Sequence, residues 1–408
     1  MTTSAPARSA PARRVKVAVA AAGFTSFALL YAPQPVLPQL AAQYHLDPAG
    51  ASLAVSVATG ALALSVLPIA ALSEVVGRRP VILTSVLVSA VLGLLLPLMP
   101  SYPLMLALRA VQGIAIAGFP GVATAYLVER LGRTGVAAAV GAMIAGNSIG
   151  GMTGRLATGF TAGPLGWRGA LSVVAGLSLV CAVITAVALP PSVPQPDAGR
   201  QTLRDVGAGL LAAVRKPVLL AQYAVALLAM GSFVALYNAA GFRLTGAPLN
   251  LSPAIASLVF LAYALGSISS AMAGRFAARI GRRRAVSATL LLMAVGAALT
   301  ISGSLVVVVL GFVVLTCAFF AAHAIANGWA AAESPANARG QVGGTYTLMY
   351  YLGSSIGGSI GSAVYGHAGW SWLIGAVVAW LVLAVGAVWV GTTARTPARR
   401  HGLAVKSS

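Results

Sequence analysis

Long runs of apolar residues, separated by short polar or basic segments, make up most of this chain. A helix needs about 20 consecutive apolar residues to cross a bilayer, so each run predicts one membrane-spanning helix. The pattern predicts twelve such helices, at residues 15–40, 51–73, 81–99, 103–127, 136–160, 168–190, 217–241, 253–274, 285–303, 305–332, 342–366 and 369–391. We therefore expect an all-α integral membrane protein whose main solvent is lipid.

The longest polar connection divides these predicted helices into six and six. It includes the stretch SVPQPDAGRQ, whose prolines and polar residues are typical of a linker. The predicted organisation is a basic tail at 1–14, a six-helix bundle at 15–190, a linker at 191–216, a second six-helix bundle at 217–391 and a tail at 392–408.

The two predicted bundles repeat each other in sequence. Gly77-Arg78-Arg79 has a counterpart in Gly281-Arg282-Arg283, and GNSIGGMTGR at 146–155 has one in GSSIGGSIGS at 353–362. These matches have nearly one separation along the chain, which indicates two parallel repeats related by an axis along the membrane normal.

Composition and charge agree with a membrane protein. Only 8% of the residues are charged, whereas a soluble domain has about 25%. The net charge of +20 comes from basic clusters between the apolar runs. The positive-inside rule then places both termini in the cytoplasm, in a multi-pass protein of the inner membrane. Cations spread in this way do not predict a nucleic-acid partner, and we expect a monomer in the lipid bilayer.

Signals of other functional classes are missing from the sequence. It has no HExxH or GxSxG motif and no pair of intramembrane acids, so we expect neither an enzyme nor a metal site. It also lacks the GxxxxGK[ST] motif of an ATP-driven pump. We expect no cofactor, with a proton gradient as the energy source and a small molecule as the substrate.

Glycines recur at helical spacing in the repeated motif. Gly146, Gly150 and Gly154, with Gly353, Gly357 and Gly361 in the second half, predict close packing between helix backbones. The adjacent helix face carries Asn147 and Arg155, which packing does not explain. We expect both in a cavity, although Arg155 could instead reach the outer membrane interface.

A second arginine lies within a predicted span. Arg109 shares one helix face with Gln112. A charge in lipid is costly unless it is paired or hydrated, so we interpret both residues as facing an internal cavity rather than as snorkelling outward.

Three of these segments resemble the major facilitator superfamily: ALSEVVGRRP at 71–80, LALRAVQGIAIAG at 106–118 and GNSIGGMTGR. The resemblance covers essentially the whole chain. With YAPQPVLPQL, MGSFVALYN, FFAAH and YYLGSSIGG, it is strongest to the YnfM-type drug and metabolite exporters. It implies an exporter-like fold and proton coupling. Arg155 replaces the proline of the antiporter motif, and Val75 replaces the arginine after the acid of the first loop.

Charged residues at the predicted cytoplasmic ends form a candidate gate. Glu74 lies at a helix end, where it can pair with neighbouring cations and hold one conformation. The gate residues that we predict are Glu74, Gly77, Arg78, Arg79, Glu129 and Glu333. The alternative is a solvated loop that only sets topology.

None of the six acids lies in the middle of a predicted span. His323 is the group there that titrates near neutral pH, and Asn327 is one turn further along the same face. We take His323, together with Arg109, as the candidates for proton coupling, with Glu129 and Glu74 at the cytoplasmic ends as alternatives. A histidine that is simply satisfied inside the bundle is the alternative.

Two arginines and no carboxylate within the spans favour a neutral or anionic substrate. Prolines 33, 35 and 38 should break the first helix near Gln34 and free carbonyl groups. Further polar residues expected along the cavity are Tyr31, Gln34, Asn238, Tyr350 and Tyr351. An importer or facilitator of a small polar metabolite, and a non-transporting sensor or scaffold, remain open.

Overall fold

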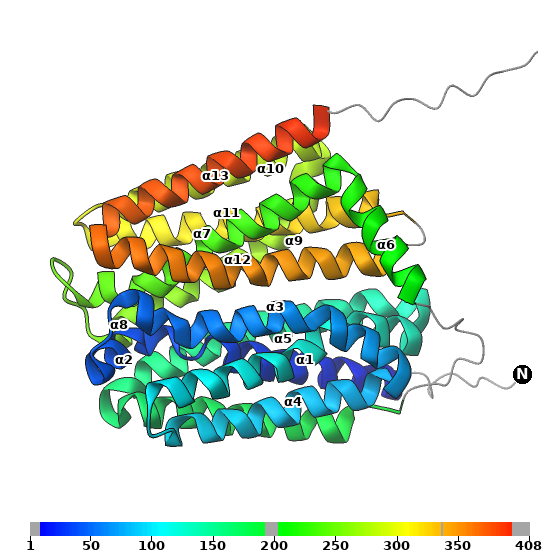
Figure 1. Cartoon of the computed structure of the whole chain (residues 1–408), viewed down its shortest axis with the longest axis horizontal. Helices are drawn as coiled ribbons and strands as arrows, with labels where there is room; N and C mark the ends of the chain where they lie inside the picture. Colours follow the sequence, from blue (N-terminus) through cyan, green and yellow to red (C-terminus); the bar gives the residue numbers. More distant parts are fainter. Residues whose placement is uncertain (1–8, 192–202, 336–337, 394–408) are drawn as a thin grey trace, which may run out of the picture.

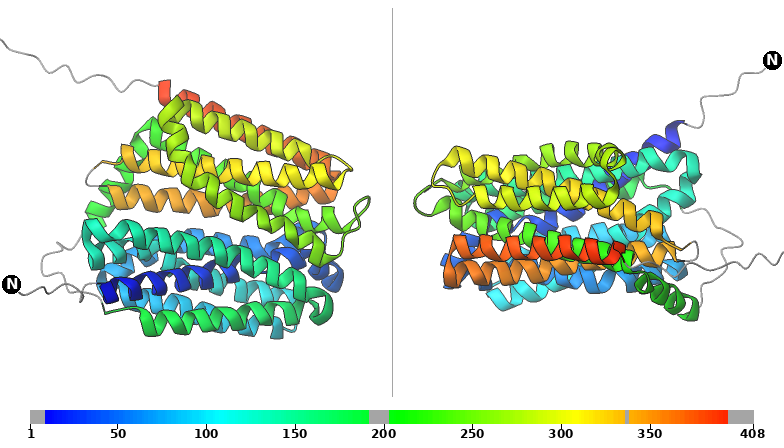
Figure 2. Two further views of the ribbon diagram at one scale, coloured as in Figure 1. Left: turned by 180° about the vertical axis from the view of Figure 1, so that it is seen from behind. Right: turned by 90° about the horizontal axis from the view of Figure 1, so that it is seen from above.

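The computed structural model describes residues 9–191, 203–335 and 338–393, and every regular element in these residues is a helix. The predicted all-α class is confirmed there. Figure 1 shows two layers of roughly parallel helices, with α1 to α5 in one and α7 to α13 in the other. The view from behind shows the same separation of the half that runs from blue to blue-green from the half that runs from bright green to red (Figure 2).

The N-terminal half begins with a broken helix. Its elements are α1 (Ser9–Tyr31), η1 (Gln34–Val36), α2 (Leu37–Tyr44), α3 (Pro48–Val76), α4 (Arg78–Leu95), η2 (Leu96–Leu98) and α5 (Tyr102–Ala188). α1 ends at Tyr31 because Pro33 and Pro35 have no N–H to continue the hydrogen bonds of the helix. The helix break expected near Gln34 is therefore present.

α5 comprises 87 residues and folds back on itself. The hydroxyl of Tyr126 donates to the carbonyl of Pro190 at 2.8 Å, although 64 residues separate them. A straight helix would separate residues 64 positions apart by about 95 Å. Gly166, whose φ is 64°, interrupts the helical path between them. α5 therefore contains the predicted spans 103–127 and 136–160 and all but the last two residues of the predicted span 168–190.

The C-terminal half has a similar series of helices: α7 (Pro217–Thr245), α8 (Pro253–Ser257), η3 (Leu258–Leu261), α9 (Ala262–Ile280), α10 (Arg282–Leu299), α11 (Leu305–Glu333), α12 (Arg339–Ala368) and α13 (Trp370–Thr393). A further helix, α6 (Leu203–Arg215), lies inside the predicted linker and packs against α7 and α12. Residues 1–8, 192–202 and 394–408, which hold most of the predicted tails and the rest of the linker, are outside the described residues.

The sequence repeat extends to the backbone. Gly77 joins α3 to α4 with φ 92° and ψ 148°, and Gly281 joins α9 to α10 with φ 86° and ψ 143°. Side-chain-bearing residues rarely adopt such angles, so both halves use glycine for the same sharp connection.

The two glycine stripes occupy equivalent places. A Cβ on any of these glycines would meet a facing helix backbone or the atoms beside it. Gly146, Gly150 and Gly154 lie against Ala20, Phe24 and Ala28 of α1, and Gly353, Gly357 and Gly361 lie against Leu227, Gly231 and Ala235 of α7. Each half thus brings its first helix into close backbone contact with its glycine-rich helix.

Nine helical segments of the described residues are long and apolar enough to cross a membrane. One of them, Gly135–Ala188, covers two of the predicted spans. α10 and α12 occupy the predicted spans 285–303 and 342–366 but are not among the nine. α10 begins with three arginines, and α12 is rich in glycine and hydroxyl groups.

The two halves meet along α3 and α12. Ser355 donates a hydrogen bond of 2.8 Å to the carbonyl of Ser56 in the first part of α3. Towards their other end, Gly344 of α12 lies against the Leu67 side chain of α3. α5 also contacts α8 and α9 across the same boundary.

Candidate functional site

Arg155 lies at the boundary between the two halves. It belongs to α5 and is only 2% exposed. Its Nε donates to Gln34 Oε1 at 2.5 Å, and its Nη1 donates to the Gly151 carbonyl at 2.7 Å. The sequence left open whether Arg155 faces inward or reaches the outer membrane interface, and the structure places it inside.

Gln34 continues this contact into the other half. Its Nε2 donates to Asn238 Oδ1 of α7 at 2.8 Å. The direction of the chain is fixed, because arginine can only donate and Gln34 must therefore present its oxygen to Arg155. Asn238 then uses its own oxygen for Gln34, which leaves its Nδ2 as a donor. Arg155, Gln34 and Asn238 form what we call the polar chain.

Three aromatic rings surround the guanidinium group. Its central carbon lies 4.3 Å from the ring centre of Tyr31, 4.7 Å from that of Tyr263 and 5.3 Å from that of Phe260. Tyr31 is in the N-terminal half and the other two rings are in the C-terminal half. Such faces attract a cation by up to about 2 kcal/mol each when desolvated. No carboxylate of a described residue lies within ion-pair distance of Arg155.

Donors without partners gather around the polar chain. Buried Asn238 Nδ2 and Ser56 Oγ make no hydrogen bond to any described residue, and both lie beside Gly358 of α12. Leaving such a group unpaired costs about 1–3 kcal/mol. The adjoining cavity, lined in part by Gln34 and Phe260, has a volume of only about 10 Å³. The site is therefore closed in this conformation, rich in donors and positively charged.

The structure corrects the prediction for Arg109 and Gln112. Arg109 is fully buried inside the N-terminal half rather than facing a cavity. It donates to the carbonyls of Ala54 at 2.6 Å, Leu29 at 3.1 Å and Leu30 at 2.6 Å, and to Gln112 Oε1 at 2.6 Å. Gln112 in turn donates to the Ser89 carbonyl at 3.0 Å.

The proline break explains why an arginine is stable at this position. The carbonyl of Leu29 would normally accept from the N–H of residue 33, which is proline and has none. Arg109 supplies the missing donor. The carbonyl freed by the break thus holds the bundle together rather than lining a transport path.

Asn147 also lies within the N-terminal half. Its side chain packs against Gly23 of α1, and its Oδ1 makes no hydrogen bond to a described residue. The sequence predicted that Asn147 and Arg155 share one helix face along a cavity. In the structure, Arg155 reaches the boundary between the halves, whereas Asn147 faces α1.

His323 lies in an aromatic cluster of the C-terminal half. Its Nδ1 is 3.1 Å from the Tyr346 hydroxyl, and its ring centre is 4.7 Å from that of Tyr350 and 6.1 Å from that of Phe319. Tyr351 packs edge-on against Tyr350. Asn327 is one turn further on and exposed.

A row of stacked rings connects this cluster to Arg155. Phe319 stacks on Phe233 at 4.0 Å between ring centres, and Phe233 lies 5.6 Å from Tyr263, which faces Arg155. Apart from Arg109, Gln112 and Asn147, which lie inside the N-terminal half, the predicted cavity residues form two groups, one at the polar chain and one around His323, and these rings lie between them.

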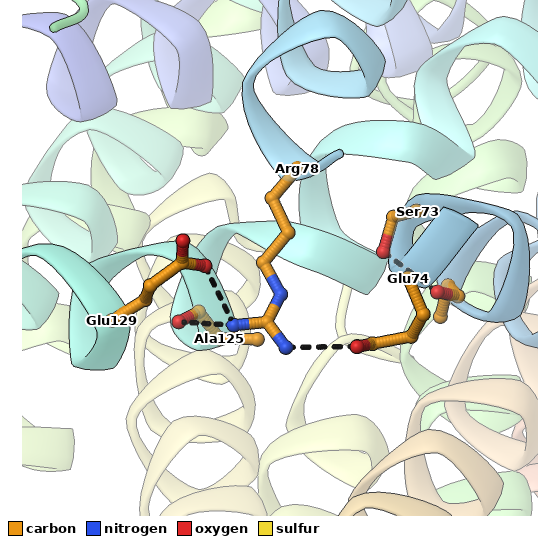
Figure 3. A network of polar contacts seen from close by, with 6 residues as sticks. Ser73, Glu74, Arg78, Ala125 and Glu129 are labelled. Atoms are coloured by element: carbon orange, nitrogen blue, oxygen red, sulfur yellow. Dashed lines mark hydrogen bonds and ion pairs between the residues drawn. The ribbon is translucent and has the colours of Figure 1, made fainter. Parts of the chain in front are cut away.

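The predicted gate is partly assembled in the N-terminal half. Arg78 donates to Glu74 Oε1 at 2.8 Å and to Glu129 Oε2 at 2.9 Å, and it also reaches the Ala125 carbonyl (Figure 3). It links the ends of α3 and α4 to α5. Arg79 instead donates to the Leu189 carbonyl at 3.0 Å.

Glu333 does not form the equivalent contact. Its backbone carbonyl accepts from Lys216 Nζ at 2.8 Å, and its carboxylate joins no ion pair with the residues that the structure describes. Ala278 stands where the first half has Glu74, so the second half lacks one of the two acids of the network.

Sequence reasoning missed three aromatic residues of the site: Phe233, Phe260 and Tyr263. A spacing of three residues does place Phe260 and Tyr263 on one helix face. Nothing in a single sequence shows that this face meets α5, because that contact joins segments about a hundred residues apart.

Comparison with known proteins agrees with the fold and the motifs. The family model of the Major Facilitator Superfamily matches residues 19–247 and 245–406, and the chain belongs to this superfamily. It is 36% identical to the inner membrane transport protein YnfM of Escherichia coli (strain K12), over 93% of this chain and 90% of that protein. It is 34% identical to the MFS-type transporter YybF of Bacillus subtilis (strain 168), over 91% and 92%.

Solved structures show the same fold. The chain superimposes with a TM-score of 0.79 on a bacterial homologue of the human lysosomal transporter Spinster in an inward-facing, unoccupied conformation. The two share 15% identity over 94% of this chain and 98% of that one. The likeness at this identity concerns the fold. The chain is thus a multi-pass membrane protein of a transporter superfamily.

Proposed function

We propose that this protein is a proton-coupled exporter that moves a small drug-like or metabolite solute, neutral or anionic, across the cytoplasmic membrane by alternating access. The chain crosses the membrane twelve times in two six-helix bundles, and both termini are cytoplasmic. The basic clusters between the predicted spans support this orientation. α10 and α12 supply two of the crossings, because they pack in the same layers as their apolar neighbours.

The observation that carries the proposal is the polar chain between the halves. Arg155 is buried, has no carboxylate partner among the described residues, and stands beside amide and hydroxyl donors that are also unpaired there. Such a group can bind a carboxylate or a carbonyl-rich solute through charge-assisted hydrogen bonds. It offers no counter-charge to a lipophilic cation.

The same residues connect binding to movement. Gln34 and Arg155 belong to the N-terminal half, whereas Asn238 and Tyr263 belong to the C-terminal half. A solute that takes over the donors of Arg155 replaces contacts that hold the halves together. Its binding energy then favours a different arrangement of the halves, as alternating access requires.

Counterflow in proteoliposomes tests this function. Vesicles are loaded with each of a panel of organic acids, neutral metabolites and lipophilic cations, and uptake of the labelled solute is followed. We expect saturable exchange of an anionic or neutral solute, with its loss in Arg155→Ala. Robust exchange of ethidium or tetraphenylphosphonium that depends on Arg155 would contradict the substrate class. Exchange of no solute at all would favour a sensor or scaffold.

A further inference from the structure

A second positively charged pocket lies far from the polar chain, where α9 ends, α10 begins and α13 ends. It has a volume of about 520 Å³. Its lining residues are Ile280, Gly281, Arg282, Arg283, Arg284, Trp329, Trp389 and Thr392. This is the end of the bundle that we assign to the cytoplasm.

The three arginines of this pocket have no hydrogen-bonding or ion-pair partner among the described residues. None of them donates a hydrogen bond there, and none lies within ion-pair distance of a described carboxylate. Buried Arg283 Nε is itself unpaired. In the first half, by contrast, Arg78, which is the counterpart of Arg282, is neutralised by Glu74 and Glu129.

Arg283 is held in an orientation that suits a ligand. Its guanidinium carbon lies 3.5 Å from the ring centre of Trp389, whose Nε1 donates to Ser287 Oγ at 3.1 Å. The Trp389 ring covers one face of the guanidinium group, and the N–H groups lie in the plane of that group. That planar edge matches the oxygens of a phosphate group.

The other half offers an internal comparison. Its pocket at the corresponding place has a volume of about 440 Å³ and is lined by Arg14, Arg79 and Arg130. There Arg14 donates to the Val187 carbonyl and Arg79 to the Leu189 carbonyl. Helix-end carbonyls thus satisfy cations in the first half, whereas no carbonyl of the described residues, which end at 393, accepts from the arginines of the second-half pocket.

We propose that the pocket around Arg282, Arg283 and Arg284 binds the phosphate group of an anionic phospholipid of the cytoplasmic leaflet. The pocket opens beside lipid-facing residues such as Val390, which is 72% exposed. Tryptophans such as Trp389 are enriched at the membrane–water boundary, and basic pockets between helix ends bind anionic headgroups. A lipid therefore brings its phosphate to the depth of these arginines.

The test compares nanodiscs of phosphatidylcholine alone with nanodiscs that also contain phosphatidylglycerol. The full chain is then extracted in detergent, and the retained lipid is measured by native mass spectrometry. We expect phosphatidylglycerol to be retained, and the double variant Arg283→Gln/Arg284→Gln to retain roughly tenfold less, because it loses charge-assisted hydrogen bonds. Arg275, Arg279 and Arg282 preserve the basic character of this segment.

Arg168→Gln is the matched control. Arg168 also stacks on a tryptophan, Trp167, at 4.3 Å, but it donates to the Pro97 carbonyl and lies outside the pocket. Equal retention in the wild type and the double variant, or an equal loss in Arg168→Gln, would overturn the proposal. If the double variant does not fold in phosphatidylcholine, Arg284→Gln alone, at an exposed side chain, should lower retention in the same direction.

Inorganic phosphate distinguishes the two sources of the ligand. We expect millimolar phosphate to leave the melting temperature in phosphatidylcholine nanodiscs unchanged, whereas phosphatidylglycerol raises it in the wild type. A rise with phosphate that equals the rise with phosphatidylglycerol, and that the double variant loses, would assign the pocket to a soluble anion instead.

Discussion

Arg155 of α5 and Tyr263 of α9 lie face to face across the boundary between the two halves, with the guanidinium carbon 4.7 Å from the ring centre. Gln34 ties the same arginine to Asn238 on α7. A path between the halves opens only when these contacts break or change partners. Arg155 is thus the residue at which binding and movement meet in the proposed cycle.

A carboxylate at position 34 should remove the preference for an anion. In Gln34→Glu, the new acid lies within hydrogen-bond distance of Arg155 and neutralises it. We expect the apparent affinity for an anionic solute to fall by roughly tenfold or more, since a charge-assisted hydrogen bond contributes about 1.5–3 kcal/mol. Counterflow at several solute concentrations measures this change.

Gln43→Glu is the control for that variant. Gln43 is exposed at the end of α2 and adds the same charge away from the polar chain. Its transport should equal that of the wild type. A similar loss in both variants would show a general effect of charge and not an effect on Arg155.

Arg109 should matter for stability rather than for coupling. Arg109→Ala leaves the carbonyls of Leu29 and Leu30 and the side chain of Gln112 without their buried donor. We expect a loss of at least about 3 kcal/mol in the free energy of unfolding, because several buried acceptors become unpaired together. The melting temperature in detergent measures it. A variant as stable as the wild type that has lost only proton coupling would contradict this assignment.

Alanine substitutions test whether the glycine stripes allow close contact between helix backbones. Gly150→Ala and Gly357→Ala place a methyl group against the facing backbone of α1 and α7 and should destabilise the protein by about 1–3 kcal/mol. Gly141→Ala lies on the same helix as Gly150 with nothing within 4 Å, so it should be neutral or slightly stabilising. Melting temperatures compare the three variants, and equal losses would argue against the close packing.

The two acids of the N-terminal gate should not be equivalent. The Glu129 side chain is 12% exposed, whereas that of Glu74 is 57% exposed, and both pair with Arg78. Solvent weakens the outer pair, so Glu74→Gln should change stability by less than about 0.5 kcal/mol and Glu129→Gln by about 1–3 kcal/mol. Thermal unfolding at low and high salt distinguishes them. The opposite ranking would contradict the geometry of this network.

His323 should affect the driving force rather than the exchange itself. In His323→Gln, we expect efflux driven by a pH gradient to disappear while counterflow continues, because the variant loses the imidazole beside Tyr346 and glutamine does not titrate. His367→Gln is the control, since His367 is exposed at the end of α12. If His323→Gln still accumulates solute against its gradient when a pH gradient is applied, the coupling assignment is wrong.

Local patterns along the chain predict much of the fold. Apolar runs locate the helices, prolines locate the break after Tyr31, and the repeated Gly-Arg-Arg motif locates two connections with the same backbone angles. Each of these features depends on residues close together in sequence. The pattern also locates α10 and α12, although arginines at the start of α10 and small polar residues in α12 make these two helices less apolar than the others.

The site was less predictable, because its geometry depends on long-range contacts. Arg109 and Arg155 have the same chemistry and similar apolar surroundings in sequence. They differ in what lies opposite: freed carbonyls of α1 for Arg109, and the aromatic rings of the other half for Arg155. Only the arrangement of the two halves distinguishes a structural arginine from one at the boundary.

The most direct test of the proposed substrate site is a binding measurement with a matched pair of ligands. An organic acid that stabilises the purified protein is compared with its neutral methyl ester, in the wild type and in Arg155→Ala, by isothermal titration calorimetry. The account predicts that the wild type binds the acid roughly tenfold or more tightly than the ester, and that Arg155→Ala removes this difference. A preference for the acid that persists in Arg155→Ala would contradict it.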